Sequence, residues 1–72
     1  MKKQTELRQD LLTVAELVQS GSTLLDVGCG TGELLKWLVE NKQVSGRGME
    51  LSQQGVNQCI AKGLAVIQGD AD

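Results

Sequence analysis

The sequence predicts an α/β fold in which helices alternate with the strands of a parallel sheet. Three segments place apolar residues at helical spacing, short apolar runs of strand length lie between them, and a glycine-rich turn joins the first run to a helix. The order is a helix, then β-α-β-α-β. Connections through helices make the strands parallel with right-handed crossovers, so we expect the sheet order 3-2-1. This is one half of a doubly wound, Rossmann-like sheet.

The first helix is expected from about Thr5 or Asp10 to Gln19, because apolar residues recur there at helical spacing. The residues that carry this spacing are Leu7, Leu11, Val14, Ala15 and Val18. Ser20-Gly21-Ser22 ends the helix, since small polar residues and glycine favour a turn. The first strand is expected over about Thr23 to Val27.

Two further helix and strand pairs are expected after the glycine-rich turn. A helix over about Gly32 to Asn41 leads to a strand over about Val44 to Glu50. Ser52 is suited to cap a third helix, and Gly63 to close that helix in the left-handed conformation. A short strand over about Leu64 to Gln68 follows.

Length and composition limit the protein to one small domain, which we take as residues 1–72. Lys and Arg number 7 and Asp and Glu number 9, so the net charge is −2, and no basic face is indicated for nucleic acid or an anionic membrane. The sequence contains no apolar run long enough for a membrane span and no signal-peptide core. We therefore expect a cytoplasmic location.

The two cysteines, Cys29 and Cys59, do not form a C-x-x-C pair, and the sequence contains no histidine. The sequence therefore gives little support to a metal site or a redox pair. Free thiols are expected. No base is predicted near Cys29, so a small side chain in a tight loop is favoured over a nucleophile.

The run from Asp26 to Gly32 places glycine at three alternate positions, Gly28, Gly30 and Gly32, directly after a strand. Glycine permits positive φ and lets a ligand approach the main chain. The helix that follows presents unpaired N–H groups and the positive end of its dipole, which attract a carboxylate or phosphate. A tight turn that is merely rich in glycine is the alternative.

Acidic residues recur at the ends of the later strands, as Glu50 and Asp70. Because the carboxyl ends of parallel strands meet at one edge, we expect both side chains near the glycine loop. Ligands of doubly wound sheets bind at this edge. The sequence therefore predicts a binding site there.

The glycine spacing separates two cofactor classes. Dinucleotide enzymes use G-x-G-x-x-G, which would need a small residue where this chain has Glu33. The pattern Asp26-x-Gly28-x-Gly30-x-Gly32 instead resembles the first motif of the class I S-adenosylmethionine-dependent methyltransferases. The resemblance continues with Glu50 after the second strand and with Gly69-Asp70-Ala71 after the third.

Within that superfamily the chain resembles the MetW family of methionine biosynthesis. The segments that carry this resemblance are Leu7-Arg8-Gln9-Asp10-Leu11, Asp26-Val27-Gly28-Cys29-Gly30-Thr31-Gly32-Glu33-Leu34-Leu35 and Val66-Ile67-Gln68-Gly69-Asp70. The resemblance covers nearly all of the chain but only the first part of the family's length. It implies a class I methyltransferase fold with S-adenosylmethionine or S-adenosylhomocysteine as the cofactor.

The resemblance also implies a role for each position of these motifs. The backbone of Gly28, Cys29, Gly30 and Gly32 would face the methionine part of the cofactor. Asp26 would help to hold its amino group, directly or through water. Asp26 would also, or instead, stabilise the glycine turn by accepting hydrogen bonds from loop N–H groups.

At the nucleoside end, Glu50 would accept hydrogen bonds from the two ribose hydroxyls. Leu51 would lie against the adenine face. Asp70 would accept from the adenine amino group, and the N–H of Ala71 would meet a ring nitrogen. A solvated carboxylate is the alternative for Glu50, and a turn residue the alternative for Asp70.

The function implied is methyl transfer by a longer parent protein, to an unknown acceptor, with no catalytic residue named. The alternatives are a non-catalytic module that partners homoserine acyltransferase and, less favoured, an NAD-binding half-domain. We expect a fragment whose helices all cover one face of the sheet. Either Leu25 and Val27 or Leu24 would then lie on a bare face, and that face or the edge of the first strand would support self-association.

Overall fold

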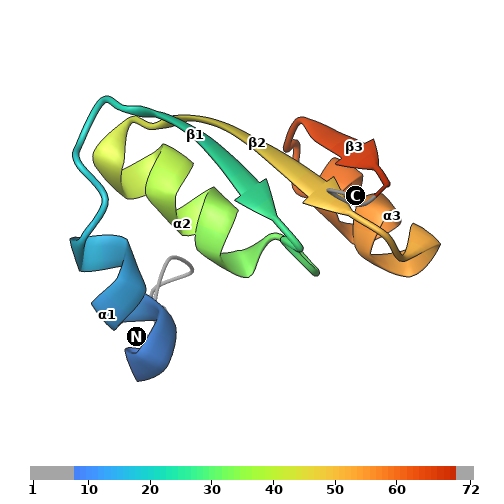
Figure 1. Cartoon of the computed structure of the whole chain (residues 1–72), viewed down its shortest axis with the longest axis horizontal. Helices are drawn as coiled ribbons and strands as arrows, with labels where there is room; N and C mark the ends of the chain where they lie inside the picture. The colour runs from blue at the N-terminus through green and yellow to red at the C-terminus, as the bar shows by residue number, and fades with distance from the viewer. Residues whose placement is uncertain (1–7, 70–72) are drawn as a thin grey trace.

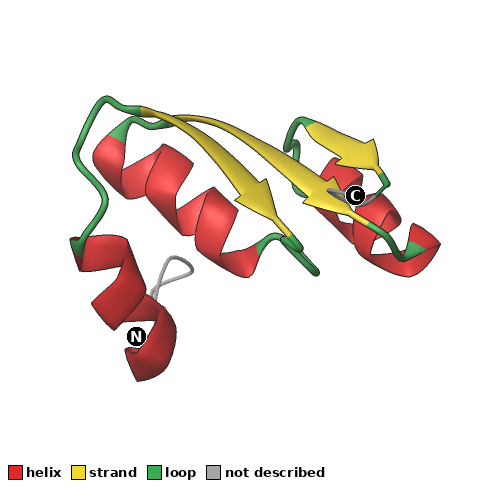
Figure 2. Cartoon of the chain, viewed as in Figure 1, coloured by secondary structure: helices red, strands yellow, loops and turns green. Residues whose placement is uncertain are grey.

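The computed structural model describes residues 8–69, as a parallel sheet with its helices gathered on one side (Figures 1 and 2). The elements are α1 (Gln9–Glu16), β1 (Thr23–Val27), α2 (Glu33–Lys42), β2 (Ser45–Glu50), α3 (Gln53–Ala61) and β3 (Val66–Gln68). The predicted order of helix, then β-α-β-α-β, is confirmed.

Strand β2 lies in the middle of the sheet and pairs in parallel with β1 and with β3. Its register places Asp26 opposite Gly48 and Glu50 opposite Gln68. The order β1-β2-β3 is the same adjacency as the predicted 3-2-1. All three arrowheads in Figure 2 point toward one edge, so the loops after the strands meet there.

Helix α2 packs closely against the sheet because β2 carries glycine where the helix approaches. A Cβ on Gly46 would lie 2.6 Å from Cδ1 of Leu35, a fully buried residue of α2. A hydrophobic core cluster joins Ala15 of α1, Leu38 of α2 and Val44 before β2. Helix α1 thus packs on α2, and Leu24 of β1 packs against the same cluster.

The opposite face of the sheet carries exposed apolar side chains in the described part of the chain. Leu25 is 52% exposed, Val27 54% and Ile67 52%, whereas Leu24 points to the helices and packs on the core. Of the two predicted alternatives, the bare face therefore holds Leu25 and Val27. Self-association through this face or along β1 stays a prediction.

Several boundaries differ from those predicted, by one residue at each end of α2 and by one to three residues at the positions below. Helix α1 ends at Glu16 and not at Gln19, and the ammonium of Lys42 bonds the carbonyl oxygens of Ala15 and Val18 beside this end at 2.9 and 2.6 Å. This cation satisfies orphan carbonyls at the negative end of the helix dipole. Strands β2 and β3 begin later than expected, at Ser45 and Val66.

Two local predictions around α3 are confirmed. The Ser52 hydroxyl accepts a hydrogen bond from the Gly55 N–H at 2.8 Å and so caps the helix. Gly63, just past the helix, is left-handed with a φ of 79°. Over residues 8–69, no helix has the length and apolar character needed to cross a membrane.

Candidate functional site

The loop from Gly28 to Gly32 joins β1 to α2 at the carboxyl edge of the sheet. Gly28, Gly30 and Gly32 have φ values of 73°, 60° and 85°, which favour glycine. A Cβ on Gly28 or Gly30 would meet nothing within 4 Å, so the main chain is open to a ligand there. A Cβ on Gly32 would lie 2.6 Å from Cδ1 of Leu64, so Gly32 serves close packing.

Backbone hydrogen bonds fix this loop to the strand beside it. The N–H groups of Gly28 and Cys29 both donate to the Met49 carbonyl, at 2.7 and 3.2 Å. The N–H of Gly32 closes the turn on the Cys29 carbonyl at 3.0 Å. The loop is therefore held to the end of β2 before any ligand binds.

Glu50 lies at the end of β2 and bridges two segments of backbone. Its Oε1 accepts from the Gly30 N–H at 2.7 Å, and its Oε2 accepts from the Ser52 N–H at 3.0 Å. The bond from Ser52 and then that from Gly30 lower the pKa of this carboxyl below its ordinary value. Glu50 is therefore an ionised, oriented acceptor.

Asp26 lies at the end of β1, half-buried beside the same loop. Burial raises the pKa of its carboxyl, and no hydrogen bond from residues 8–69 offsets this effect. Within residues 8–69 no loop N–H donates to Asp26, and the Gly30 N–H donates to Glu50 instead. The Asp26 oxygens stay available to a cationic partner.

Gly55, in the first turn of α3, makes room for the Glu50 side chain. A Cβ there would lie 2.8 Å from both the Glu50 Cγ and the Gly30 carbonyl oxygen. The sequence analysis assigned no role to this residue. An isolated glycine inside a helical pattern was the available signal, because it often marks a close approach.

Two hollows flank the loop and share Gly30 and Thr31. The first, of about 280 Å³, is lined by Arg8, Leu11, Asp26, Gly28, Cys29, Gly30, Thr31, Glu33 and Leu34. The second, of about 310 Å³, is lined by Gly30, Thr31, Glu50, Ser52, Gln54, Gly55 and Gln58. One carboxylate from a strand end thus lies in each hollow.

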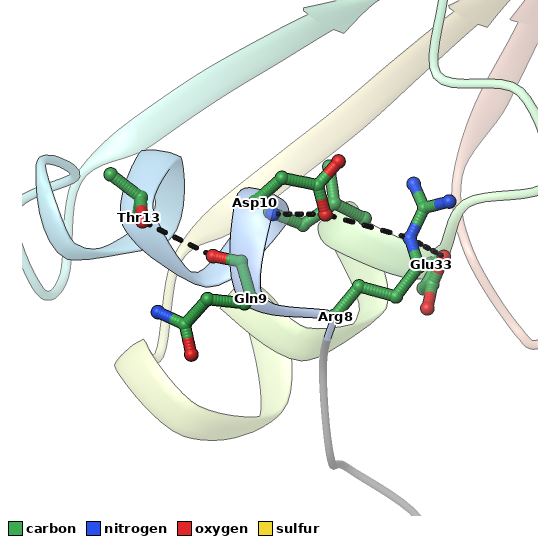
Figure 3. Close-up of polar contacts among 6 residues, drawn as sticks. Arg8, Gln9, Asp10, Thr13 and Glu33 are labelled. Carbon is green, nitrogen blue, oxygen red and sulfur yellow. Dashed lines mark hydrogen bonds and ion pairs between the residues drawn. The ribbon is translucent and has the colours of Figure 1, made fainter.

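Arg8 enters the first hollow from the start of α1, which sequence spacing did not indicate. Its Nε lies 3.7 Å from the Glu33 carboxylate and 3.8 Å from that of Asp10 (Figure 3). Both of these ion pairs use Nε, so within residues 8–69 no ion pair occupies the outer nitrogens of the guanidinium. The hollow therefore presents a cation and a carboxylate to one ligand.

Leu51 is the remaining predicted position that the structure describes, and it directly follows Glu50, which lines the second hollow. Leu51 is 66% exposed directly after Glu50, and its carbonyl accepts from the Gln68 side chain at 3.3 Å. The Gly69 N–H donates to the Glu50 carbonyl at 3.0 Å, which brings the end of β3 beside Glu50. Asp70 and Ala71 lie outside the described residues.

The fold and the arrangement of its loops define a Rossmann-like protein of the methyltransferase kind. The family model described as "Methionine biosynthesis protein MetW" matches residues 8–72. The chain therefore belongs to the MetW family. This confirms the resemblance drawn from the sequence motifs.

Two solved structures share the fold. The M1A22 tRNA methyltransferase TrmK of Bacillus subtilis is 26% identical with a TM-score of 0.79, and the alignment covers 93% of this chain and 32% of TrmK. An S-adenosylmethionine-dependent methyltransferase of Geobacter sulfurreducens is 26% identical with a TM-score of 0.75, over 93% of this chain and 31% of that one. The latter was crystallised with S-adenosylhomocysteine.

A curated relative, the "Bifunctional methionine biosynthesis protein MetXA/MetW" of Rhodopirellula baltica, is 29% identical over 72 positions. The match covers 89% of this chain and 12% of the relative. The chain therefore spans about a third of the solved structures that it matches and a small part of this relative.

Proposed function

We propose that residues 1–72 bind S-adenosylmethionine or S-adenosylhomocysteine as the cofactor-binding half of a methyltransferase domain. The observation that carries the proposal is the 2.7 Å hydrogen bond from the Gly30 N–H to Glu50. It joins the glycine loop to the acidic end of β2 and leaves one hollow on each side. The methyltransferase of similar fold that was crystallised with S-adenosylhomocysteine supports the choice of cofactor.

The second hollow fits a nucleoside. Each Glu50 oxygen accepts one backbone hydrogen bond and has a further lone pair, so each can accept from one ribose hydroxyl. The exposed Leu51 side chain is proposed to cover the adenine face. Asp70 and the N–H of Ala71, which follow Gly69, are proposed to bond the adenine edge.

The first hollow fits the amino-acid part of the cofactor. Asp26 is proposed to accept from the ammonium group, which would also stabilise its ionised form. The outer guanidinium nitrogens of Arg8, with the N-terminus of α2, are proposed to meet the carboxylate. Gly28, Cys29 and Gly30 line this hollow, with open space over Gly28 and Gly30. Their backbone, with that of Gly32, is proposed to face the methionine part of the cofactor.

These residues position the cofactor and take no part in bond making. The cofactor supplies a methyl group on a sulfonium, and its transfer to an acceptor is an in-line displacement in which alignment contributes much of the barrier reduction. Asp26 and Glu50 hold the two ends of the cofactor on either side of the loop. The acceptor is unassigned.

Calorimetric titration of the 72-residue chain with S-adenosylhomocysteine tests this proposal, with NADH as the competing ligand. Binding of the first ligand alone, weakened by Glu50→Ala and unchanged by Glu40→Ala, would support it. Glu40 is an exposed α2 carboxylate, so its removal changes the net charge equally. Equal affinity for NADH, or unchanged affinity in Glu50→Ala, would reject it.

A non-catalytic module that partners homoserine acyltransferase is the second candidate. The bifunctional name of the Rhodopirellula relative, which joins MetW to a second part, favours a physical association in methionine synthesis. Co-purification of the parent protein with the acyltransferase, unaffected by Glu50→Ala and without methylation activity, would favour this candidate over the first.

A further inference from the structure

Two cysteines from distant parts of the chain meet inside the site. Cys29 lies in the loop after β1 and Cys59 in α3, and their Sγ atoms are 3.6 Å apart. Cys59 is fully buried, Cys29 is half-buried, and both are free thiols. The 30-residue separation gave no sign of this contact.

Glycines confine both sulfur atoms. A Cβ on Gly48 would lie 2.5 Å from the Cys29 Sγ, and a Cβ on Gly32 would lie 2.9 Å from the Cys59 Sγ. The thiols therefore occupy space that two missing side chains provide. A disulfide bond of about 2.05 Å needs the sulfurs to approach by roughly 1.5 Å, which is within the reach of a loop movement.

We propose that Cys29 and Cys59 are an oxidisable pair that a hydroperoxide converts into a disulfide. The disulfide alters the loop from Gly28 to Gly32. The Cys29 thiolate attacks a peroxide oxygen and breaks the O–O bond, giving a sulfenic acid and, after protonation, water or an alcohol. The Cys59 thiol then attacks the sulfenic sulfur, the S–O bond breaks, and water leaves. Both cysteines are oxidised and the hydroperoxide is reduced.

The surroundings make this oxidation slow at neutral pH. Burial, the contact with Cys59 and the charges of Asp26 and Glu50 raise the pKa of the Cys29 thiol to about 12. Among the described residues, Arg8 and Glu33 also line that hollow, and the Lys62 ammonium donates to the Thr31 carbonyl of the same loop at 2.8 Å. Below the pKa of the thiol, the rate should rise about tenfold per pH unit, because the thiolate is the nucleophile.

The disulfide would affect the proposed cofactor site through Gly30, which contacts both Cys59 and Glu50. Its carbonyl accepts from the Cys59 thiol at 3.4 Å, and its N–H donates to Glu50. The disulfide removes the thiol proton and draws Cys29 toward α3, so it disturbs the residue that holds Glu50. This consequence rests on the proposed function, whereas formation of the disulfide does not.

The test treats the 72-residue chain with hydrogen peroxide at neutral and alkaline pH, blocks free thiols, and digests the chain with trypsin without reduction. The expected product is a linked pair of the peptides 9–36 and 48–62, formed faster at the higher pH in monomeric protein. Cys29→Ser and Cys29→Ala should abolish the link. Blocked thiols at both positions, links between chains only, or irreversible oxidation of Cys29 alone would overturn the proposal.

Two readouts on the oxidised wild type keep the test independent of variant folding. Its melting temperature should rise, because the cross-link closes a long loop, and reductant should reverse the rise. Its affinity for S-adenosylhomocysteine should fall about tenfold, the scale of one charged hydrogen bond. A disulfide in a chain that never binds this ligand would reject the proposed function and leave the redox pair standing.

Discussion

The ends of β1 and β2 carry one carboxylate each, and the protein treats the two in opposite ways. Glu50 accepts two backbone hydrogen bonds and its pKa is lowered. Asp26 is half-buried, and its pKa is raised by that burial. Glu50 therefore stabilises the folded loop, whereas Asp26 is held in an environment that disfavours its charge.

The difference separates a structural contribution from a functional one. A carboxylate whose charge lowers the stability of the free protein is typical of a functional site, because perturbed pKa values cluster at such sites. A bound cationic partner would offset the cost of that charge. Glu50 can serve both purposes, since its oxygens keep further lone pairs. Predictions about the two residues should therefore differ in sign for stability and agree in sign for binding.

Removal of the Glu50 carboxylate should give the largest effect. Glu50→Ala deletes both proposed ribose acceptors and both backbone bonds, so affinity for S-adenosylhomocysteine should fall about 100-fold, since hydrogen bonds to a charged acceptor are the stronger kind. Glu50→Gln retains one acceptor oxygen and should lie between this variant and the wild type. Calorimetry measures both, and an effect of Glu40→Ala of similar size would refute the assignment.

Much of this arrangement could be predicted from the sequence, because the strand ends of a parallel sheet meet at one edge wherever their side chains point. The position of Glu50 beside the glycine loop followed from that rule. Its hydrogen bond to Gly30 did not, since it depends on which loop N–H faces β2. The turn-stabilising role was therefore predicted for Asp26 and not for Glu50.

Contacts between helix side chains and the loop were the part that the sequence could not provide. Helical periodicity places Gly55 and Cys59 on the inner face of α3, but not the depth at which α3 packs. That depth brings Gly55 against Glu50 and Cys59 against Cys29. Arg8 was missed for the same reason, because its place depends on how α1 packs on α2.

A methyl group added at Gly55 should displace Glu50 and leave Asp26 untouched. The Cβ of Gly55→Ala would overlap Glu50 and the Gly30 carbonyl, and overpacking of this kind costs roughly 1–3 kcal/mol, against about 1 kcal/mol gained from helix propensity. The net loss of stability should be about 1 kcal/mol, with a loss of affinity of about tenfold. Urea unfolding measures the first quantity and calorimetry the second.

Asn57→Ala is the matched control for this variant, because Asn57 is exposed on the same helix and bonds only the Gln53 side chain in the described residues. It should leave the affinity unchanged, and the free energy of unfolding should change by roughly 0.5 kcal/mol or less, because the gain in helix propensity opposes the loss of the Gln53 contact. A stabilised Gly55→Ala protein with unchanged affinity would mean that Glu50 does not depend on the space that Gly55 leaves.

Asp26→Asn should weaken binding while it leaves the fold intact or strengthens it. The amide removes a charge that burial disfavours, so the free energy of unfolding should stay level or rise. Affinity for S-adenosylhomocysteine should fall about fivefold to tenfold, because the ammonium group loses an ionised acceptor. We therefore expect the melting temperature to stay level or rise while the affinity measured by calorimetry falls. A fall in both quantities would mean that Asp26 stabilises the glycine turn.

The smallest expected effect is on the loss of stability at acid pH, and it distinguishes Glu50 from Asp26 without a ligand. The folded pKa of Glu50 lies below its ordinary 4.5, so its contribution is present above that value and is lost as the pH falls through the folded pKa. The folded pKa of Asp26 lies above its ordinary 3.8, so its charge costs stability at neutral pH, and that cost disappears as the pH falls through the raised pKa. Thermal melting from about pH 7 to about pH 3 should therefore show a shallower acid loss in Glu50→Gln than in the wild type. Asp26→Asn should lose stability more steeply than the wild type, because the variant has no buried charge whose cost disappears in acid. Identical profiles for both variants would mean that the two strand ends do not differ electrostatically.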